Sequence, residues 1–164
     1  MTINPSKFAL IAALTVSTFT LPARAADAPV LKPFMVAVSV ADLKKETDWY
    51  VTMLGAKIVK DADFGNGGTH FRWLMIGEQR LELVYSPTAK DMAPARAKPP
   101  AHAGLHGYTH FTLLSSDLAA TKAALIAKGA TLAMDITEVT PLGIKVLYLA
   151  DPEGNAVEIA QPAG

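Results

Sequence analysis

The sequence contains no cysteine. This absence excludes disulfide bonds, thiolate metal sites and cysteine nucleophiles, so the folded chain must be stabilised by its core. Neither sign of charge is in excess, because 15 acidic residues balance 15 basic ones, and no run of Lys or Arg stands out. A balanced charge argues against nucleic acid and against an anionic membrane surface as partners. We therefore expect a small molecule, as ligand or substrate.

The chain also lacks an apolar run long enough to span a membrane. The N-terminal run FALIAALTVSTFTL, residues 8–21, is interrupted by Ser and Thr and is shorter than the ~20 residues of a spanning helix. Lys7 precedes it, and PARAADAP follows with an Ala-x-Ala site. These features predict a signal peptide, residues 1–25, with cleavage after Ala25 and a secreted or periplasmic protein free of the membrane. An uncleaved anchor is the alternative.

What the sequence does contain is an internal repeat. The order strand, helix, strand, strand, strand occurs twice, with Asp42 and Asp117 as predicted helix N-caps. After an extension over residues 26–32, the predicted domain covers residues 33–162, with module one at 33–86, a linker at 87–106 and module two at 107–162. Neither copy is large enough to be a comfortable independent domain, so the two are expected to pair in one α+β fold.

Each copy places a glutamate among apolar residues of its last strand: Glu82 in RLELV and Glu158 in AVEIA. Strand alternation turns these carboxylates away from the face that packs on the helix. The same alternation places His110 and Tyr108 on that opposite face in the first strand of module two. Met35 corresponds to His110, because each lies seven residues before the Asp that starts its helix. Pairing of the modules is expected to gather Met35, Glu82, His110 and Glu158 on one concave face.

Four stretches, VSVADLKKETDWYVTMLGAKIV, RLELVYS, GYTHFTLLSSDL and YLADPEGNAVEIAQ, resemble the vicinal oxygen chelate superfamily of glyoxalase I, bleomycin and fosfomycin resistance proteins and extradiol dioxygenases. The resemblance covers residues 33–162. It implies two paired βαβββ modules that form a half-open barrel around a cavity, a homodimer, and a divalent metal (Fe, Mn, Ni or Zn). At the matching positions it implies Glu82, His110 and Glu158 as metal ligands, whereas Met35 replaces the expected histidine.

Two functions remain open. In a metal-dependent lyase, isomerase or dioxygenase acting on a small oxygenated metabolite, Glu82 and Glu158 are the expected catalytic groups, which bind the metal or move a proton. The soft thioether of Met35 suits such a metal poorly. The alternative is a metal-free protein that binds or sequesters a drug-like or aromatic molecule. The residues expected to line the substrate pocket are Met35, His70, Trp73 and Tyr108.

A purely structural interpretation competes with both functions. His110 is then a core histidine whose nitrogens are satisfied by the backbone or by a glutamate, and the two glutamates pair with Arg72 or Arg80. His102 and His106 lie in the linker and are expected to be exposed to solvent. A linker that acts as a lid over the pocket is the other possibility for this segment.

Overall fold

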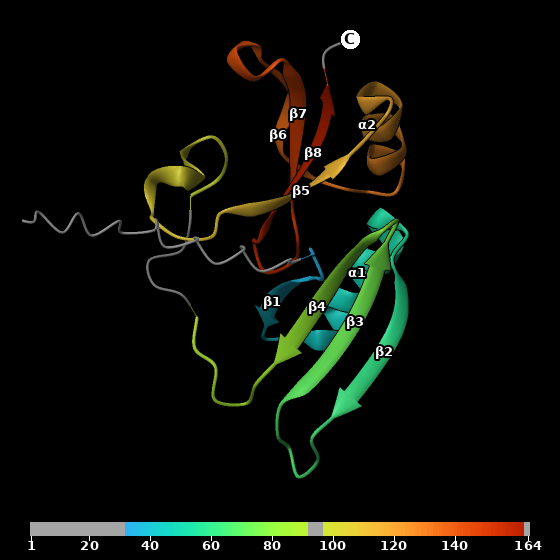
Figure 1. The fold of residues 1–164 in the computed structure, drawn as a ribbon, viewed down its shortest axis with the longest axis vertical. Coiled ribbons are helices and arrows are strands. Elements are labelled where there is room, and N and C mark those ends of the chain that lie inside the picture. The colour runs from blue at the N-terminus through green and yellow to red at the C-terminus, as the bar shows by residue number, and fades with distance from the viewer. Residues whose placement is uncertain (1–31, 92–96, 163–164) are drawn as a thin grey trace, which may run out of the picture. The chain divides into compact units, whose positions relative to one another are not determined.

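The computed structural model describes residues 32–91 and 97–162. Two modules of the same βαβββ order follow one another along the chain (Figure 1). The first consists of β1 (Val36–Val40), α1 (Leu43–Leu54), β2 (Lys57–Asp63), β3 (His70–Ile76) and β4 (Gln79–Tyr85). The second consists of β5 (His110–Leu114), α2 (Leu118–Ala127), β6 (Leu132–Val139), β7 (Ile144–Ala150) and β8 (Ala156–Pro162). The predicted α+β fold of two βαβββ modules is confirmed.

Two short 3-10 helices, η1 (Ala101–Gly104) and η2 (Thr140–Leu142), complete the described structure. η1 lies in the predicted linker, where the sequence gave no sign of a helix. The predicted signal peptide lies outside the described residues, and so does the extension except for Lys32. Within the described ranges, neither helix has the length and apolar character needed to cross a bilayer.

Each module forms a four-stranded sheet, in the orders β1-β4-β3-β2 and β5-β8-β7-β6, and neither sheet closes on itself. The first and last strands of each module are parallel, because the helix provides the crossover that a parallel pair requires. The register pairs Ala37 with Glu82 and Thr112 with Glu158. The two glutamates therefore occupy equivalent positions in the two sheets.

Both helices begin, and α1 ends, at residues with the expected capping chemistry. Asp42 Oδ1 accepts a hydrogen bond of 2.9 Å from the Lys45 amide, and Asp117 Oδ1 accepts one of 2.9 Å from the Ala120 amide. At the end of α1, Gly55 adopts the left-handed conformation, with φ of 68°, which glycine reaches without steric cost. Each helix packs on one face of its own sheet (Figure 1).

Most of the buried apolar residues of both modules form one continuous core, and a second, smaller cluster contains Val146, Tyr148 and Ala160. Alternate residues of the inner strands face the helices and are buried: Leu74, Leu81 and Leu83 in the first sheet, and Leu147, Leu149 and Val157 in the second. Each of these side chains stabilises the fold by about 1.5–3 kcal/mol through removal of apolar surface from water. The opposite face of each sheet carries the glutamate of its last strand, Glu82 in the first sheet and Glu158 in the second.

The junction between the modules is formed by α1 and the turn between β7 and β8. Tyr50 of α1 donates a hydrogen bond of 3.2 Å to Asp151 Oδ2 and stacks on Phe111 of β5. Glu153 accepts hydrogen bonds of 2.9 and 2.8 Å from the amides of Ala41 and Asp42. Residues 151–155, DPEGN, thus form the turn between β7 and β8, and this turn also joins the two modules.

A third acid, Glu46, is buried at this junction. Its side chain is 0 % exposed, and within the described part of the chain neither carboxylate oxygen has a hydrogen-bond partner. Burial, together with the neighbouring charges of Asp151 and Glu153, raises the pKa of Glu46 to about 8. Burial also raises the pKa of Asp151, although the hydrogen bonds that its carboxylate accepts oppose this effect.

Candidate functional site

The candidate site lies on the face of the second sheet that turns away from α2. Glu158 stands at its centre, because the register places Thr112 of β5 and Tyr148 of β7 directly beside it on the neighbouring strands. Thr112 Oγ1 donates to Glu158 Oε2 at 2.6 Å, and the Tyr148 hydroxyl donates to Oε1 at 2.5 Å. His110 Nε2 lies 3.5 Å from Oε2. Both oxygens of this carboxylate are therefore engaged.

The linker contributes a second histidine to this cluster. His102 of η1 places its Nε2 3.0 Å from His110 Nδ1, and the two nitrogens share a hydrogen bond. The rings of His102 and His110 lie 5.2 and 5.3 Å from the ring of Tyr148. The expectation that His102 is exposed to solvent is wrong, since the residue is only 7 % exposed. His106 is exposed, as expected. The Glu158 cluster, as we name it, comprises His102, His110, Thr112, Tyr148 and Glu158.

The electrostatics of the Glu158 cluster favour the neutral forms of His110 and Tyr148. Burial lowers the pKa of His110, as does the neighbouring His102, whereas Glu158 opposes the shift. The pKa of Tyr148 is raised by burial and by its contact with Glu158. At neutral pH the phenol therefore keeps its proton and donates a hydrogen bond to the carboxylate. The side chains of His110 and Glu158 remain 23 % and 12 % exposed, which leaves part of the cluster open to a ligand.

Module one repeats one part of this arrangement. Glu82 Oε1 accepts a hydrogen bond of 2.7 Å from Trp73 Nε1, and Trp73 faces Glu82 in the register as Tyr148 faces Glu158. In both modules an aromatic donor on the third strand thus holds the glutamate of the fourth. Ala37 occupies the place of Thr112, so Glu82 lacks the hydroxyl donor that Thr112 provides to Glu158. The half-buried Met35 directly precedes β1.

The predicted metal ligands do not form one site within the chain. His110 and Glu158 are neighbours, but Glu82 belongs to the other sheet. Over residues 32–91 and 97–162, no three side chains of His, Asp or Glu converge in a way that holds a metal ion. The nitrogens of His110 face His102 and Glu158, and the oxygens of Glu158 are taken by hydroxyl donors. This donor set does not fit a divalent metal, which needs several free ligand atoms directed at one point.

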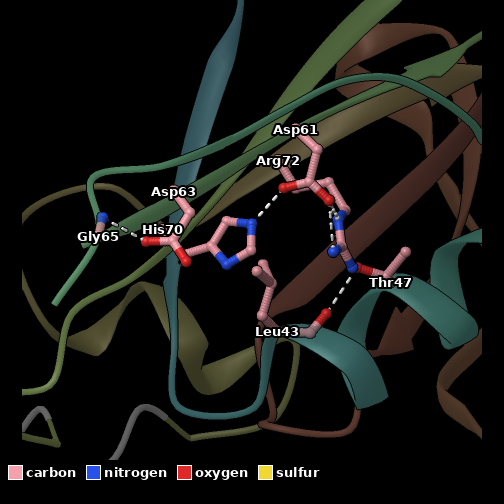
Figure 2. A network of polar contacts seen from close by, with 7 residues as sticks. All are labelled: Leu43, Thr47, Asp61, Asp63, Gly65, His70 and Arg72. Carbon is pink, nitrogen blue, oxygen red and sulfur yellow. Dashed lines mark hydrogen bonds and ion pairs between the residues drawn. The ribbon is translucent and has the colours of Figure 1, made fainter. Parts of the chain in front are cut away.

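His70 lies on the other face of the first sheet. Arg72 lies two residues later and therefore on the same face of β3. It pairs with Leu83 in the register, and Leu83 faces the core beneath α1. His70 Nε2 bonds to Asp61 Oδ1, and Arg72 donates to Asp61 Oδ2 and to Thr47 of α1 (Figure 2). Although partial burial acts in the opposite direction, the hydrogen bonds from His70 and Arg72 lower the pKa of Asp61. This network joins the sheet to its helix, and it separates His70 from Trp73.

Tyr108, the remaining predicted pocket residue, is exposed just before β5. It lines a cleft of about 860 Å³ whose walls include Ser39, Tyr85 and Asn155. The Glu158 cluster is not part of that wall. The predicted residues thus lie at several separate places in the structure. Three residues that were not predicted as site residues, His102, Thr112 and Tyr148, contact His110 or Glu158. The repeat held a signal for Tyr148, which occupies the place of Trp73, but the position of His102 follows from no local pattern.

Comparisons with known proteins agree with this geometry. The sequence profile of the Glyoxalase/Bleomycin resistance protein/Dioxygenase superfamily matches residues 32–159. A glyoxalase family protein from Enterococcus faecalis is 21% identical, with a TM-score of 0.64 over 79% of this chain and 96% of that one. A trypanothione-dependent glyoxalase I from Leishmania major is 18% identical, with a TM-score of 0.59 over 80% and 87% of the two chains.

The fosfomycin resistance protein FosX from Listeria monocytogenes is 11% identical, with a TM-score of 0.58 over 81% of this chain and 94% of that one. At such identities the structural likeness shows the shared fold alone. A comparison with curated protein sequences finds no significant match.

Proposed function

The chain belongs to the glyoxalase, bleomycin resistance protein and dioxygenase superfamily, and on that premise we propose that its second module binds a small organic ligand without a resident metal. The observation that carries this proposal is the Glu158 carboxylate, which two hydroxyl donors fix between aromatic rings while part of it remains exposed. A fixed acceptor beside aromatic walls is a common way to bind a small molecule.

The chemistry of the cluster indicates a planar cation or a planar donor of hydrogen bonds. Glu158 supplies negative charge, and the faces of Tyr148 and the two imidazoles provide surfaces on which a flat cation packs favourably. His102 covers part of this surface, so the ligand must contact or displace the η1 segment. A ligand of this class was the metal-free alternative that the sequence left open.

The first test is the binding of N-methylquinolinium, a planar cation, by isothermal titration calorimetry. We expect Glu158→Gln to weaken binding at least tenfold, because the variant removes the charge and keeps the shape; a tenfold loss corresponds to about 1.4 kcal/mol. Glu138→Gln, an exposed acid-to-amide change on β6, is the matched control and should bind as the unaltered protein does. Neutral quinoline should bind more weakly than the cation.

The rival function is that of a metal-dependent lyase, isomerase or dioxygenase. It requires Fe, Mn, Ni or Zn in stoichiometric amounts in protein purified without a histidine tag, and the loss of that metal in His110→Ala. That result, or equal binding of N-methylquinolinium by Glu158→Gln and the unaltered protein, would overturn the metal-free proposal. Metal analysis and calorimetry on one preparation therefore separate the two functions.

We also propose that the protein is exported and acts as a homodimer. The motif at residues 23–25 supports export. Dimer formation is supported by β1 and β5, which are the outer strands of their sheets and have one edge without a strand neighbour in the described part of the chain. Intact-mass measurement of the protein recovered from the expressing cells should give the mass of a chain that begins at Ala26. Light scattering should give twice that mass, and a full-length monomer would contradict both expectations.

A further inference from the structure

Two basic side chains flank Trp73 on the face of the first sheet opposite α1. Lys60 of β2 and Glu82 of β4 both pair with Trp73 in the register, and Arg80 lies two residues before Glu82, so all four side chains share one face. Lys60 Nζ lies 4.7 Å from the centroid of the Trp73 ring, and the guanidinium carbon of Arg80 lies 5.2 Å from it. The same carbon lies 4.3 Å from the centroid of the Phe34 ring.

The positive charge of this face is not neutralised by ion pairs. Glu82, the acid on the same face, gives one oxygen to Trp73 Nε1. The ion pairs within residues 32–91 and 97–162 involve neither Arg80 nor Lys60. Contact with aromatic faces compensates these cations in part, but an aromatic face does not remove their positive charge.

Arg80 carries the decisive feature. Its Nε atom is buried and has no hydrogen-bond partner among the described residues. A buried donor without an acceptor is unfavourable and rare in folded proteins, and it calls for a specific explanation. Beside it, Phe34 is 59 % exposed. The unpartnered Nε donor of Arg80 and the exposed ring of Phe34 therefore lie next to each other.

We propose that Arg80, Lys60 and Phe34 form a subsite for a small organic anion. A carboxylate or phosphate oxygen of the ligand accepts the hydrogen bond from Arg80 Nε, and the planar guanidinium suits such an oxyanion. The ammonium of Lys60 adds positive charge, and the apolar body of the ligand lies on Phe34. This inference does not depend on the proposed function, because it concerns the other module and a ligand group of opposite charge.

The fluorescence of Trp73 reports directly on this subsite. The chain contains two tryptophans, so Trp49→Phe leaves Trp73 as the single reporter. Phenylacetate is the first probe, inorganic phosphate the second, and phenylethylammonium the control of similar shape and opposite charge. We expect a saturable change in Trp73 emission with phenylacetate or with phosphate, and none with phenylethylammonium. The anion that binds with the higher affinity shows whether the subsite prefers a carboxylate or a phosphate.

Two substitutions in this background separate a binding role of Arg80 from a packing role. Arg80→Gln should weaken anion binding at least tenfold. Arg80→Lys, which keeps the charge and loses the Nε donor, should weaken binding by a smaller factor, and it serves where Arg80→Gln fails to fold. Lys60→Gln should weaken binding two- to threefold, and Lys145→Gln, an exposed site on β7, should have no effect. Unchanged binding in both Arg80 variants, equal binding of the cation, or no saturable response to either anion would overturn the proposal.

Discussion

Replacing Glu46 by glutamine should stabilise the protein at alkaline pH and leave it nearly unchanged at acidic pH. The pKa of Glu46 rises from its ordinary value of 4.5 to about 8 in the folded state. The folded protein therefore binds more protons than the unfolded chain between these two pH values, and the free energy of unfolding falls as the pH rises through this window. The full shift corresponds to about 5 kcal/mol at most, since one pKa unit is 1.36 kcal/mol. Because burial of the glutamine amide offsets part of this gain, we expect the variant to be about 2–3 kcal/mol more stable at pH 9.

The measurement is guanidinium chloride unfolding at pH 5, 7 and 9. The unaltered protein should lose stability over this range, and Glu46→Gln should lose much less. Glu78→Gln is the matched control, because this residue is exposed in the turn between β3 and β4, and its pH profile should follow that of the unaltered protein. Parallel profiles for Glu46→Gln and the unaltered protein would show that Glu46 is ionised in the folded state at no cost.

Glu46 also illustrates how far the sequence specifies this fold. The helix containing it was predictable, because Asp42 provides the cap, Gly55 ends the helix, and the apolar spacing between them is helical. The strands were predictable from their alternation. That an acid on the helix is buried was not predictable, because its surroundings come from the turn between β7 and β8, more than a hundred residues later in the chain. Local patterns contain no information on such distant contacts.

The candidate site, too, was predictable only in part. The repeat predicts that Glu82 and Glu158 are equivalent, since equivalence within each sheet follows from strand order and register. It does not predict that they meet, because that depends on how one sheet lies against another. His102 was expected in solvent for a similar reason: nothing in a linker rich in Pro and Ala indicates that one imidazole packs on Tyr148. The composition indicates a linker, but the burial of His102 depends on a tertiary contact with Tyr148, which composition does not reveal.

Replacing Asp151 by alanine should be the most destabilising single change at the module junction. Its buried carboxylate accepts hydrogen bonds from the amides of Glu153 and Asn155, from the Asn155 side chain and from the Tyr50 hydroxyl. Alanine leaves the fully buried Tyr50 hydroxyl without an acceptor and removes the hydrogen bonds that shape the turn. We expect a loss of about 3–4 kcal/mol in the free energy of unfolding at pH 7.

Asparagine at position 151 separates the two roles of the carboxylate. It keeps one oxygen as an acceptor, so Asp151→Asn should cost only about 1–2 kcal/mol at pH 7. It also removes the charge that helps to raise the pKa of Glu46, so stability should fall less steeply between pH 5 and pH 9 than in the unaltered protein. Asp91→Asn, the same chemical change at an exposed linker position, should alter neither the stability nor its pH dependence. If Asp151→Asn retains the full pH dependence, the shift of Glu46 arises from burial and Glu153 alone, and the charge of Asp151 is not felt across the junction.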